Sequence, residues 1–594
     1  MKGLKPSYLL CLATLFCSTA NATDAAQVTD TKGQPTQPNI VLILADDLAF
    51  MDLGAYGSEI KTPNIDQLAL RGIRFSNYHT AASCAPSRAM LLTGVDNHRN
   101  GVANIPEALP PEQKKHDNYQ GVLGHNAVTV ATLLQQQGYH TYLSGKWHLG
   151  KTPDLLPYRR GFERTLAMMD TGTDNWEQRP YLPIYEKGNW TADGEEITLE
   201  KDFYSSELLV DSMLGFIDQN KNNGQPFFAY LPFLAVHLPV QAPKEFTDDY
   251  LDTYGKGWGN LRQSRYSSAQ DIGLIPNSAA LAADQFTQDW NTLSQDEKRY
   301  NAKRMAVYAG MITAMDHHIG RLIDYLKANG KFENTIFIIT SDNGPEAAEL
   351  GPIMIKSQGY NTDYDTLGEK GSFNFIGQNF ASAVASPLAF FKFYAGEGGL
   401  RVPLIISGKN IPQQSGFNSA FSYVTDITPT ILQLTGTQPA TKRYAGRPVE
   451  PIIGKSLLPL INQKSEKIYQ QNEYVGYEVA GNKALFNDDY KIVFNRGPLG
   501  DNQWHLFNIK TDPGETIDLK STNPIQFQSM LNMYQEYVAN NNVLPVNSIY
   551  SQQGQVIKNG LRDVYSSRLT VVFLLFVILL SCYLYARSKK RDKT

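Results

Sequence analysis

The sequence predicts an α/β fold in which a large sheet lies between layers of helices, followed by a smaller C-terminal α+β part that carries an antiparallel sheet. Two continuous apolar runs of strand length, residues 39–44 and 335–340, are typical of strands buried on both faces of a sheet. Helical periodicity precedes further buried strands, in the pairs 128–137 with 139–143 and 203–219 with 226–231. A chain that alternates in this way builds a sheet that is covered on both faces.

The clearest helix covers residues 305–326, where apolar side chains recur at spacings of three and four. Gly330 lies just beyond it and supplies a C-terminal stop. Asp316, His317 and His318 lie inside this helix. Adjacent histidines on a helix point in different directions, so this group does not predict a metal site.

The C-terminal part follows a different pattern from the rest of the chain. Short segments that alternate apolar and polar residues indicate a small antiparallel sheet. They lie at residues 474–478, 490–494 and 504–509. Because a chain of 594 residues exceeds the size of one hydrophobic core, we expect a catalytic domain over residues 39–436 and a C-terminal subdomain over residues 437–540.

The composition is that of an ordinary globular protein, with 42% hydrophobic residues, 19% charged residues and a net charge of −4. This weak charge gives no basis for binding nucleic acid. Cys11 and Cys17 lie in an apolar leader and Cys582 in an apolar C-terminal run. Cys84 is then the single cysteine of the folded part, so we expect no disulfide framework, and a bacterial periplasm is favoured over a disulfide-rich ectodomain.

Both ends of the chain carry targeting features. Residues 1–22 are interpreted as a signal peptide, because lysines precede an apolar stretch that ends in a small-x-small cleavage site, and residues 23–38 as a flexible N-terminus. The apolar run 569–586 is close to the minimum length of a transmembrane helix. The basic tail 587–594 follows it, which predicts an exported domain anchored at the periplasmic face of the bacterial inner membrane. Residues 541–568 would form the stalk; a removable sorting tail or a buried core helix is the alternative interpretation of the apolar run.

Polar side chains follow both buried strands at the points where the strands end. Asp46 and Asp47 come directly after the first strand, and Asp342 and Asn343 after the second. Ligands of open α/β sheets gather at the carboxyl ends of the strands, so these side chains are candidates for one site. They offer only oxygen atoms, which favours calcium or magnesium over zinc. Capping or turn roles for the same residues are the competing interpretation.

The motif Cys84-Ala85-Pro86-Ser87-Arg88 is the most specific feature of the sequence. With it, the chain from residue 39 to about residue 543 resembles the type I, formylglycine-dependent sulfatases of the alkaline phosphatase superfamily, and bacterial arylsulfatases in particular. Further similar segments are 46–54, 62–66, 144–150, 160–162 and 227–243. The resemblance implies an alkaline-phosphatase-like large mixed sheet and an enzyme that hydrolyses sulfate esters, of aryl or related alcohols, to alcohol and inorganic sulfate.

By the same resemblance, Cys84 is oxidised to formylglycine by a formylglycine-generating enzyme or an anaerobic sulfatase-maturing enzyme. The hydrated aldehyde has two hydroxyls on one carbon, of which one attacks sulfur and the other expels sulfate. The implied metal is calcium, with magnesium as the alternative, because such a cation lowers the cost of ionising the attacking hydroxyl. Its implied ligands are Asp46, Asp47, Asp342, Asn343 and the modified residue that replaces Cys84. Asp342 would double as the base for the attacking hydroxyl.

The resemblance also assigns roles to five other polar residues. Arg88 would hold the hydrate and offset negative charge, and Lys146 and Lys392 would bind the sulfate oxygens. His148 would assist the hydrate during sulfate release, and His237 would protonate the departing alcohol. Taken singly, each of these residues also has a structural interpretation, as a solvated lysine or a packed or capping histidine.

Two other functions share these residues. A phosphodiesterase or phosphonate hydrolase is the nearest alternative, because sulfate and phosphate esters have the same tetrahedral geometry. A catalytically silent, calcium-dependent binder of sulfated glycans is the alternative outside the enzymes. His79, His98, His125 and His140 have no motif role and are interpreted as structural, with His98 close enough to the motif to line the pocket.

Residues 245–299 and 346–391 are long insertions without a clear counterpart in the family. Substrate choice tends to reside in long loops over a rigid sheet. The aromatic residues of the second insertion suit either a bound aryl or sugar ring or the hydrophobic core. They are Tyr360, Tyr364, Phe373, Phe375, Phe380, Phe390 and Phe391.

Overall fold

The computed structural model describes residues 37–562. From Pro38 onward the described chain belongs to one compact unit, so the C-terminal sheet is not a separate body. Among residues 37–562, no helix combines the length and the apolar character needed to cross a bilayer. The predicted signal peptide, membrane anchor and basic tail lie outside the described residues.

The predicted large mixed sheet is present, with ten strands in the order β11-β2-β10-β9-β1-β8-β4-β5-β6-β7. Its centre is parallel, because β1 pairs in parallel with both β8 and β9. β10 runs antiparallel to its neighbours β9 and β2. The strands are β1 (Asn39–Ala45), β2 (Gly72–Phe75), β4 (His140–Lys146), β5 (Arg164–Met168), β6 (Trp190–Ala192), β7 (Glu195–Glu196), β8 (Phe227–Pro232), β9 (Thr335–Ser341), β10 (Leu404–Gly408) and β11 (Phe417–Asn418).

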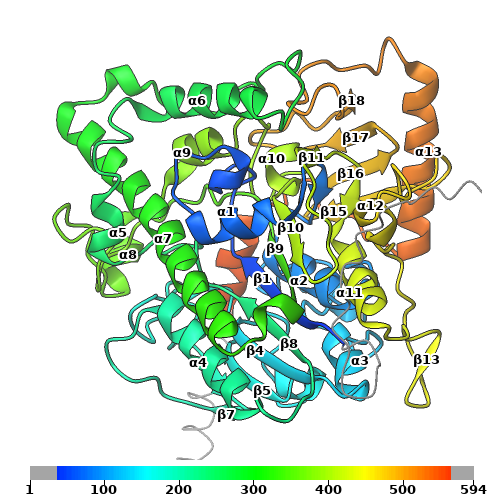
Figure 1. Ribbon diagram of the computed structural model, residues 1–594. Coiled ribbons are helices and arrows are strands. Elements are labelled where there is room, and N and C mark those ends of the chain that lie inside the picture. The colour runs from blue at the N-terminus through cyan, green and yellow to red at the C-terminus, as the bar shows by residue number, and fades with distance from the viewer. Residues whose placement is uncertain (1–36, 563–594) are drawn as a thin grey trace, which may run out of the picture. The chain divides into compact units, whose positions relative to one another are not determined.

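Helices cover both faces of this sheet (Figure 1). Along β1, Ile40 and Leu42 belong to one hydrophobic core and Val41 and Ile43 to the other, as the alternation of a doubly covered strand requires. One core includes α1 (Pro63–Leu70), α4 (Ser205–Gln219), α7 (Gln295–Ala328) and α9 (Gly377–Val384). The other includes α2 (Cys84–Thr93), α3 (Val130–Gln136), α11 (Ile427–Thr435) and α12 (Leu458–Ile461). The remaining helices of the larger part are α5 (Lys244–Asp248), α6 (Gly257–Asp271), α8 (Pro352–Ser357) and α10 (Glu397–Leu400).

The helix predicted over residues 305–326 is longer than its apolar pattern. α7 begins at Gln295, because Ser294 and Glu297 form a capping box in which each side chain accepts a hydrogen bond from the other residue's backbone. The exposed first turns carry no apolar periodicity, so the pattern alone could not mark this start. Asp316 accepts hydrogen bonds from the backbone of Asn64 and Ile65 at the start of α1, which is a structural role.

The predicted small antiparallel sheet has four strands, β15 (Val475–Val479), β16 (Asn482–Asn487), β17 (Tyr490–Phe494) and β18 (Trp504–Asn508). Its one unexpected strand is β16, which forms a tight hairpin with β15 through Ala480 and Gly481, both with positive φ. Helix α13 (Pro524–Asn541) packs Met530, Tyr534 and Tyr537 against this sheet. Short two-residue strands complete the fold, β3 (Tyr78–His79), β12 (Ser422–Tyr423), β13 (Arg443–Tyr444) and β14 (Arg447–Pro448).

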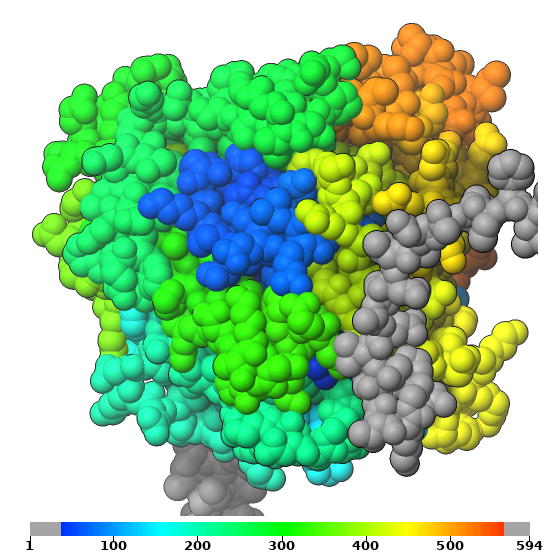
Figure 2. Space-filling model, in the orientation of Figure 1, coloured from blue at the N-terminus to red at the C-terminus, as the bar shows by residue number. Residues whose placement is uncertain are grey.

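Segments from distant parts of the sequence form one continuous surface. Figure 2 shows the blue elements near the start of the described chain between green segments from its middle and yellow segments from later in the chain. The boundary expected near residue 436 therefore does not divide the protein into bodies with separate surfaces. This interleaving allows side chains from the C-terminal sheet to reach the catalytic part.

A buried ion network joins the catalytic part to the C-terminal sheet. Glu397 at the start of α10 pairs with His79, Arg401 and Lys491, at 3.0, 2.8 and 2.8 Å. Lys491 belongs to β17 and also pairs with Glu515. Burial alone would raise the pKa of Glu397, but Lys491, His79 and Arg401 hold it well below its usual range. The network therefore fixes the loop that precedes α10 against the C-terminal sheet.

The segment expected as a stalk, residues 541–568, differs from the prediction over the part that the structure describes. Residues 541–562 run along the catalytic part, and residues 552–562 form a helix. Arg496 donates to the backbone carbonyls of Asn547, Ser548 and Tyr550. The Tyr550 hydroxyl in turn donates to the carbonyl of Ala108. A polar composition suggested a solvated linker, but here the polar groups serve as hydrogen-bond partners across the surface.

His98 does not line the catalytic pocket, because it lies between the turn after α2 and the C-terminal sheet. Its Nε2 contacts Glu478 Oε2 at 2.8 Å, and its Nδ1 lies 3.3 Å from Asp96 and 3.2 Å from the Tyr537 hydroxyl. Burial alone would lower the pKa of His98, but hydrogen bonds with Asp96 and Glu478 raise it to about 9. The imidazolium is thus part of the contact between the turn after α2 and the C-terminal sheet.

This contact predicts a pH dependence of stability. The pKa of His98 is higher in the folded chain, so its contribution is complete below about 6.5, the unfolded value, and is lost as the pH rises through about 9. We expect His98→Gln to remove a pH-dependent component on the order of 3 kcal/mol from the free energy of unfolding. Guanidinium unfolding across this pH range measures it. A wild-type slope in His98→Gln would contradict the assignment, and His125→Gln, at an exposed ion pair, is the control.

Candidate active site

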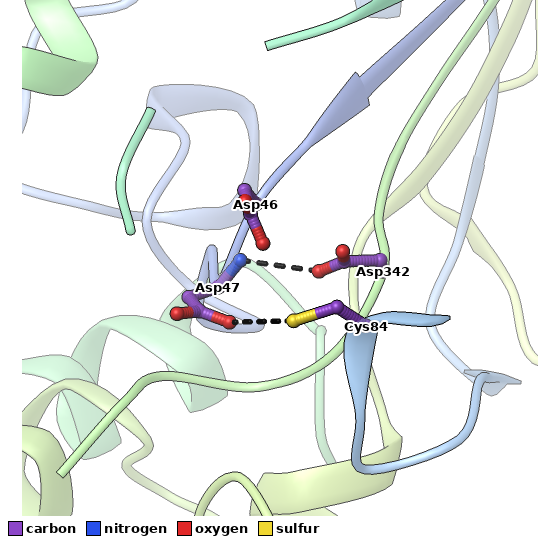
Figure 3. A group of neighbouring side chains, drawn as sticks. All are labelled: Asp46, Asp47, Cys84 and Asp342. Atoms are coloured by element: carbon purple, nitrogen blue, oxygen red, sulfur yellow. Dashed lines mark hydrogen bonds between the residues drawn. The ribbon is translucent and has the colours of Figure 1, made fainter. Parts of the chain in front are cut away.

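The four predicted oxygen ligands meet at one edge of the large sheet. In the parallel pair β1 and β9, Ala45 lies opposite Ser341, so the residues that follow both strands emerge side by side. The backbone N–H of Asp47 donates to Asp342 Oδ1 at 3.2 Å, as Figure 3 shows. Asn343 Nδ2 donates to Asp47 Oδ1 at 2.7 Å. The sequence-based placement of these residues at one site agrees with this geometry.

Cys84 is the first residue of α2, and its side chain points into this group (Figure 3). Its Sγ lies 3.9 Å from Asp47 Oδ1. One ligand atom from each of Cys84, Asp46, Asp47 and Asp342 lies within 4.8 Å of the others. Burial raises the pKa of the Cys84 thiol, so the thiol is protonated at neutral pH and is a weak nucleophile.

Three cationic side chains surround the carboxylates. Arg88, one turn along α2, donates from Nε to Asp342 Oδ2 at 2.8 Å. Lys146, the last residue of β4, contacts Asp46 Oδ2 at 2.5 Å. Lys392 lies 2.7 Å from Asp47 Oδ1. All three cations are buried, which makes their attraction to the carboxylates much stronger than in water.

The pKa values of the carboxyl groups reflect this balance of burial and charge. Burial raises the pKa of Asp47 to about 7, although Lys392 opposes the change. It also raises the pKa of Asp342, where the charge of Asp46 adds to the effect. For Asp46, Lys146 and Arg88 outweigh burial and hold the pKa well below its usual range. The site thus stabilises negative charge unevenly, most strongly at Asp46.

The residues present fit a hard divalent cation. Asp46 Oδ1 and Asn343 Oδ1 are buried in this group, and neither accepts a hydrogen bond. Asp46 Oδ1 has only an ion-pair contact with Arg88 Nη2 at 3.5 Å. Buried oxygens that accept no hydrogen bond are rare in folded proteins and call for a ligand. A set of three carboxylates and a carboxamide suits calcium or magnesium.

Glycines bring the loops of the site into close contact. The N–H of Gly344 donates to the carbonyl of Gly399 at 3.0 Å. A Cβ on Gly344 would lie 1.9 Å from the carbonyl oxygen of Gly398, which no side chain tolerates. The loop of Asn343 can therefore approach the segment that follows Lys392 only because glycines occupy positions 344, 398 and 399.

His148 has a partner that the sequence did not reveal. Its Nε2 lies 3.3 Å from Glu107 Oε2, and its Nδ1 is buried without a partner. Glu107 also accepts a hydrogen bond from the Tyr185 hydroxyl. His148 lowers the pKa of Glu107 to about 2 against the effect of burial, so Glu107 is ionised. His148 and Asp47 both have left-handed φ angles, 56° and 66°, which concentrates backbone strain at the site.

His237 faces the same carboxylates from the loop after β8. Its Nδ1 donates to the carbonyl of Leu238 at 2.6 Å, and its Nε2 lies 3.8 Å from Asp47 Oδ2. Burial, Lys392 and Lys146 hold the pKa of His237 well below its ordinary value. The ring is therefore neutral, with Nε2 as the atom turned toward the site.

A cavity of about 230 Å³ opens beside this group. Cys84, His237 and Lys392 lie on its wall, so the catalytic group and the cavity form one site. The lining of the cavity also includes Ile105, Glu107, Tyr181, Leu182, Leu238, Glu346, Glu349, Met354, Phe393, Gln553, Val556 and Ile557.

Two carboxylates of this site were missed in the sequence. Glu346 contacts Lys392 at 3.1 Å and directly follows the Asp342 to Pro345 segment, so its position was a usable signal. Glu107 lies in a loop without regular structure or a motif and offered none. His125 and His140 are occupied by surface ion pairs, and His79 by the Glu397 network.

The aromatic residues of the second insertion are largely core residues. Tyr360, Phe373, Phe375, Phe380 and Phe391 are all buried. None of the seven residues named in the sequence analysis lies on the wall of the catalytic cavity. The insertion does supply part of the wall, but through Glu346 to Met354.

Comparisons with known proteins show the family to which the chain belongs. Residues 38–437 match the family model described as Sulfatase. The chain is 34% identical to an uncharacterized sulfatase of Schizosaccharomyces pombe, across 86% of this chain and 95% of the relative, and 34% identical to an arylsulfatase of Klebsiella aerogenes, across 71% and 92%. The crystal structure of Ps i-CgsB has a TM-score of 0.61 and 25% identity, and the match covers 89% of this chain and 98% of that chain. The chain therefore belongs to the sulfatase family, as a type I sulfatase of the alkaline phosphatase superfamily that hydrolyses sulfate esters.

Proposed function

We propose that this sulfatase acts through a formylglycine made from Cys84, placed beside a calcium ion. One observation carries the proposal: Cys84 Sγ and oxygens of Asp46, Asp47 and Asp342 lie within 4.8 Å of one another in a buried group. A nucleophile at this position meets the metal and the sulfur of the substrate together. Asn343 Oδ1, which accepts no hydrogen bond, completes the set of oxygen ligands.

The oxidised residue solves the problem that the buried thiol poses. Conversion takes the Cys84 Cβ from thiol to aldehyde with loss of the sulfur, and a formylglycine-generating enzyme or an anaerobic sulfatase-maturing enzyme supplies the oxidant. In place, the hydrate provides one hydroxyl for attack on sulfur and a second for release of sulfate, and the cation lowers the cost of ionising the first.

Lys146 and Lys392 bind the sulfate group in this proposal. Their ammonium groups contact Asp46 and Asp47, and these carboxylates are the metal ligands. With the carboxylates engaged by a cation, both ammoniums are available to sulfate oxygens. Together with Arg88 they form a fixed cationic pocket for the negative charge that spreads over the transferring group.

The two histidines divide the proton transfers. His237 Nδ1 is committed to the carbonyl of Leu238, so Nε2 is the atom that faces the departing alcohol. Because the neutral ring has no proton on Nε2, Nε2 must first take up a proton and then passes it to the alcohol. Glu107 accepts from Nε2 of His148, which leaves Nδ1 of His148 as the basic atom for the hydrate during sulfate release. Glu107 is thus a positioning residue, because it fixes the tautomer of His148.

The first prediction concerns the nucleophile. Mass spectrometry of the Cys84 peptide from protein made in its native host should show formylglycine in place of the thiol. Cys84→Ala should lower kcat on phenyl sulfate by at least about 10⁴-fold and leave the melting temperature nearly unchanged, because it removes the nucleophile but no core packing. An intact thiol in a fully active protein would falsify the mechanism.

The second prediction concerns the metal. Asp46→Asn should weaken calcium binding, measured by calorimetry, by at least about tenfold, because it removes a charged ligand. Prolonged treatment with a strong chelator should reduce activity, and added calcium should restore it. Asp248→Asn is the control, because Asp248 is exposed and pairs only with Lys244 within its helix. Full activity after complete calcium removal would contradict the proposal.

The third prediction separates positioning from binding at His148. Glu107→Gln should lower kcat by roughly 10- to 100-fold with a smaller change in KM, because it disturbs the tautomer of His148 and not the sulfate contacts. Glu112→Gln, at an exposed acid of the same loop, should behave as wild type. An unchanged kcat in Glu107→Gln would exclude this role.

A further inference from the structure

The helix formed by residues 552–562 supplies one wall of the catalytic cavity (the red helix in Figure 1). Gln553, Val556 and Ile557 line the cavity together with Cys84 and His237. Their spacing of three and four places them on one face of the helix, which is the face turned to the cavity. A segment more than 450 residues after Cys84 in the sequence therefore lines the same cavity as Cys84.

This helix is held to the loop that carries Glu107. Asn559 Nδ2 donates to the backbone carbonyls of Glu107 and Leu109, at 2.8 and 3.0 Å. Asn559 is buried, so these bonds are shielded from water. A Cβ on Gly560 would lie 2.2 Å from Ile184, so the helix backbone packs closely against this neighbour. The wall is therefore an ordered part of the site.

The cavity has a distinct chemical character away from the sulfate-binding group. Ile105, Leu182, Leu238, Met354 and Val556 give the cavity an apolar lining. The acidic side chains that line this cavity are Glu107, Glu346 and Glu349. Among residues 37–562, the one lysine or arginine on this wall is Lys392, and it is already paired with Asp47 and Glu346.

Such a cavity accepts one kind of leaving group. An apolar alcohol gains by burial against the aliphatic side chains. An alcohol that carries a second anionic group must lose its hydration and approach carboxylates of the same sign. Multiply sulfated sugars are therefore poor candidates, because their additional charges would meet this wall without a cation to pair with.

Building on the proposed function, we infer that residues 552–562 form the leaving-group wall of this sulfatase, and that the wall selects esters of uncharged, largely apolar alcohols over esters whose alcohol carries a second negative charge. Val556 and Ile557 contact the leaving group directly. Glu107 and Glu349 supply the repulsion, because Glu346 is already paired with Lys392.

The test uses two substrates of similar size, 4-isopropylphenyl sulfate and 4-carboxyphenyl sulfate, and the full-length, matured protein. We expect wild-type kcat/KM to favour the neutral ester by at least about tenfold. Val556→Lys should raise the relative kcat/KM of the carboxylate by about tenfold, because it places a cation beside the leaving group. Ile557→Lys provides the same test at an exposed position on the cavity wall, where the substitution spares the fold.

Leu561→Lys is the matched control, because it adds the same charge to the same helix at an exposed position outside the cavity. It should keep the wild-type ratio. Equal ratios in Val556→Lys, Ile557→Lys and Leu561→Lys would overturn the inference, as would a wild-type preference for the carboxylate.

A binding measurement separates this inference from the proposed mechanism. Calorimetry with 4-isopropylbenzenesulfonate and 4-carboxybenzenesulfonate needs no turnover and no formylglycine. The neutral-tailed sulfonate should bind wild type at least about tenfold more tightly, and Val556→Lys should narrow the difference. Equal affinities of wild type for the two sulfonates would overturn the inference about the leaving-group wall, even if sulfate esters are hydrolysed. A thiol at Cys84 in a fully active protein would overturn the mechanism, while the sulfonate comparison would still test the leaving-group wall.

Discussion

The parallel pairing of β1 with β9 is the constraint on which the site depends. Its register brings the ends of both strands to one place, so Asp46, Asp47 and Asp342 are forced together out of water. Buried carboxylates at this separation repel one another and lose hydration, and such an arrangement is stable only with positive charge beside it. Arg88 and Lys146 contribute part of this charge from α2 and β4. The elements around the sheet are placed where they can deliver these cations.

The position of Lys392, the third cation of the site, depends on contacts outside its own loop. It comes from an irregular loop, so its position must be fixed from outside. The glycine contacts hold this loop against Asn343, and Glu397, five residues later, binds Lys491 of the C-terminal sheet. The smaller sheet is therefore more than a cover for the cleft, because its buried lysine helps to set the position of a cation in the catalytic group. This is a physical reason for the two sheets to belong to one compact unit.

The sequence predicted what local pattern and motif encode. The buried strands, the helix of residues 305–326 and the group around Cys84 could be placed because apolar periodicity and strand-end carboxylates are short-range signals. Glu107 could not be found, because its role depends on a contact with His148, 41 residues away, that no pattern records. The prediction of a stalk was wrong over residues 541–562 for a related reason. Polar composition indicates solvent exposure only when the polar groups lack partners in the fold. The aromatic residues of the second insertion suited either a bound ring or the hydrophobic core, and the burial of most of them favours the core.

The sequence predicted most residues on the sulfate side of the site and missed most of those on the leaving-group side. Apart from the loop of Lys392, the sulfate side is built from strand ends and the first turn of a helix, where the backbone is fixed by hydrogen bonding and residue types are restricted by charge. The leaving-group side is built from the loop of Glu107, the start of the second insertion and residues 552–562, which meet only through tertiary packing. A change to Val556 or Ile557 alters the fit of an alcohol without disturbing the balance of buried charge, whereas Glu107 and Glu346 serve both sides through His148 and Lys392. Selectivity can therefore vary at the helix of residues 552–562 while the chemistry, which rests on the sheet, stays the same.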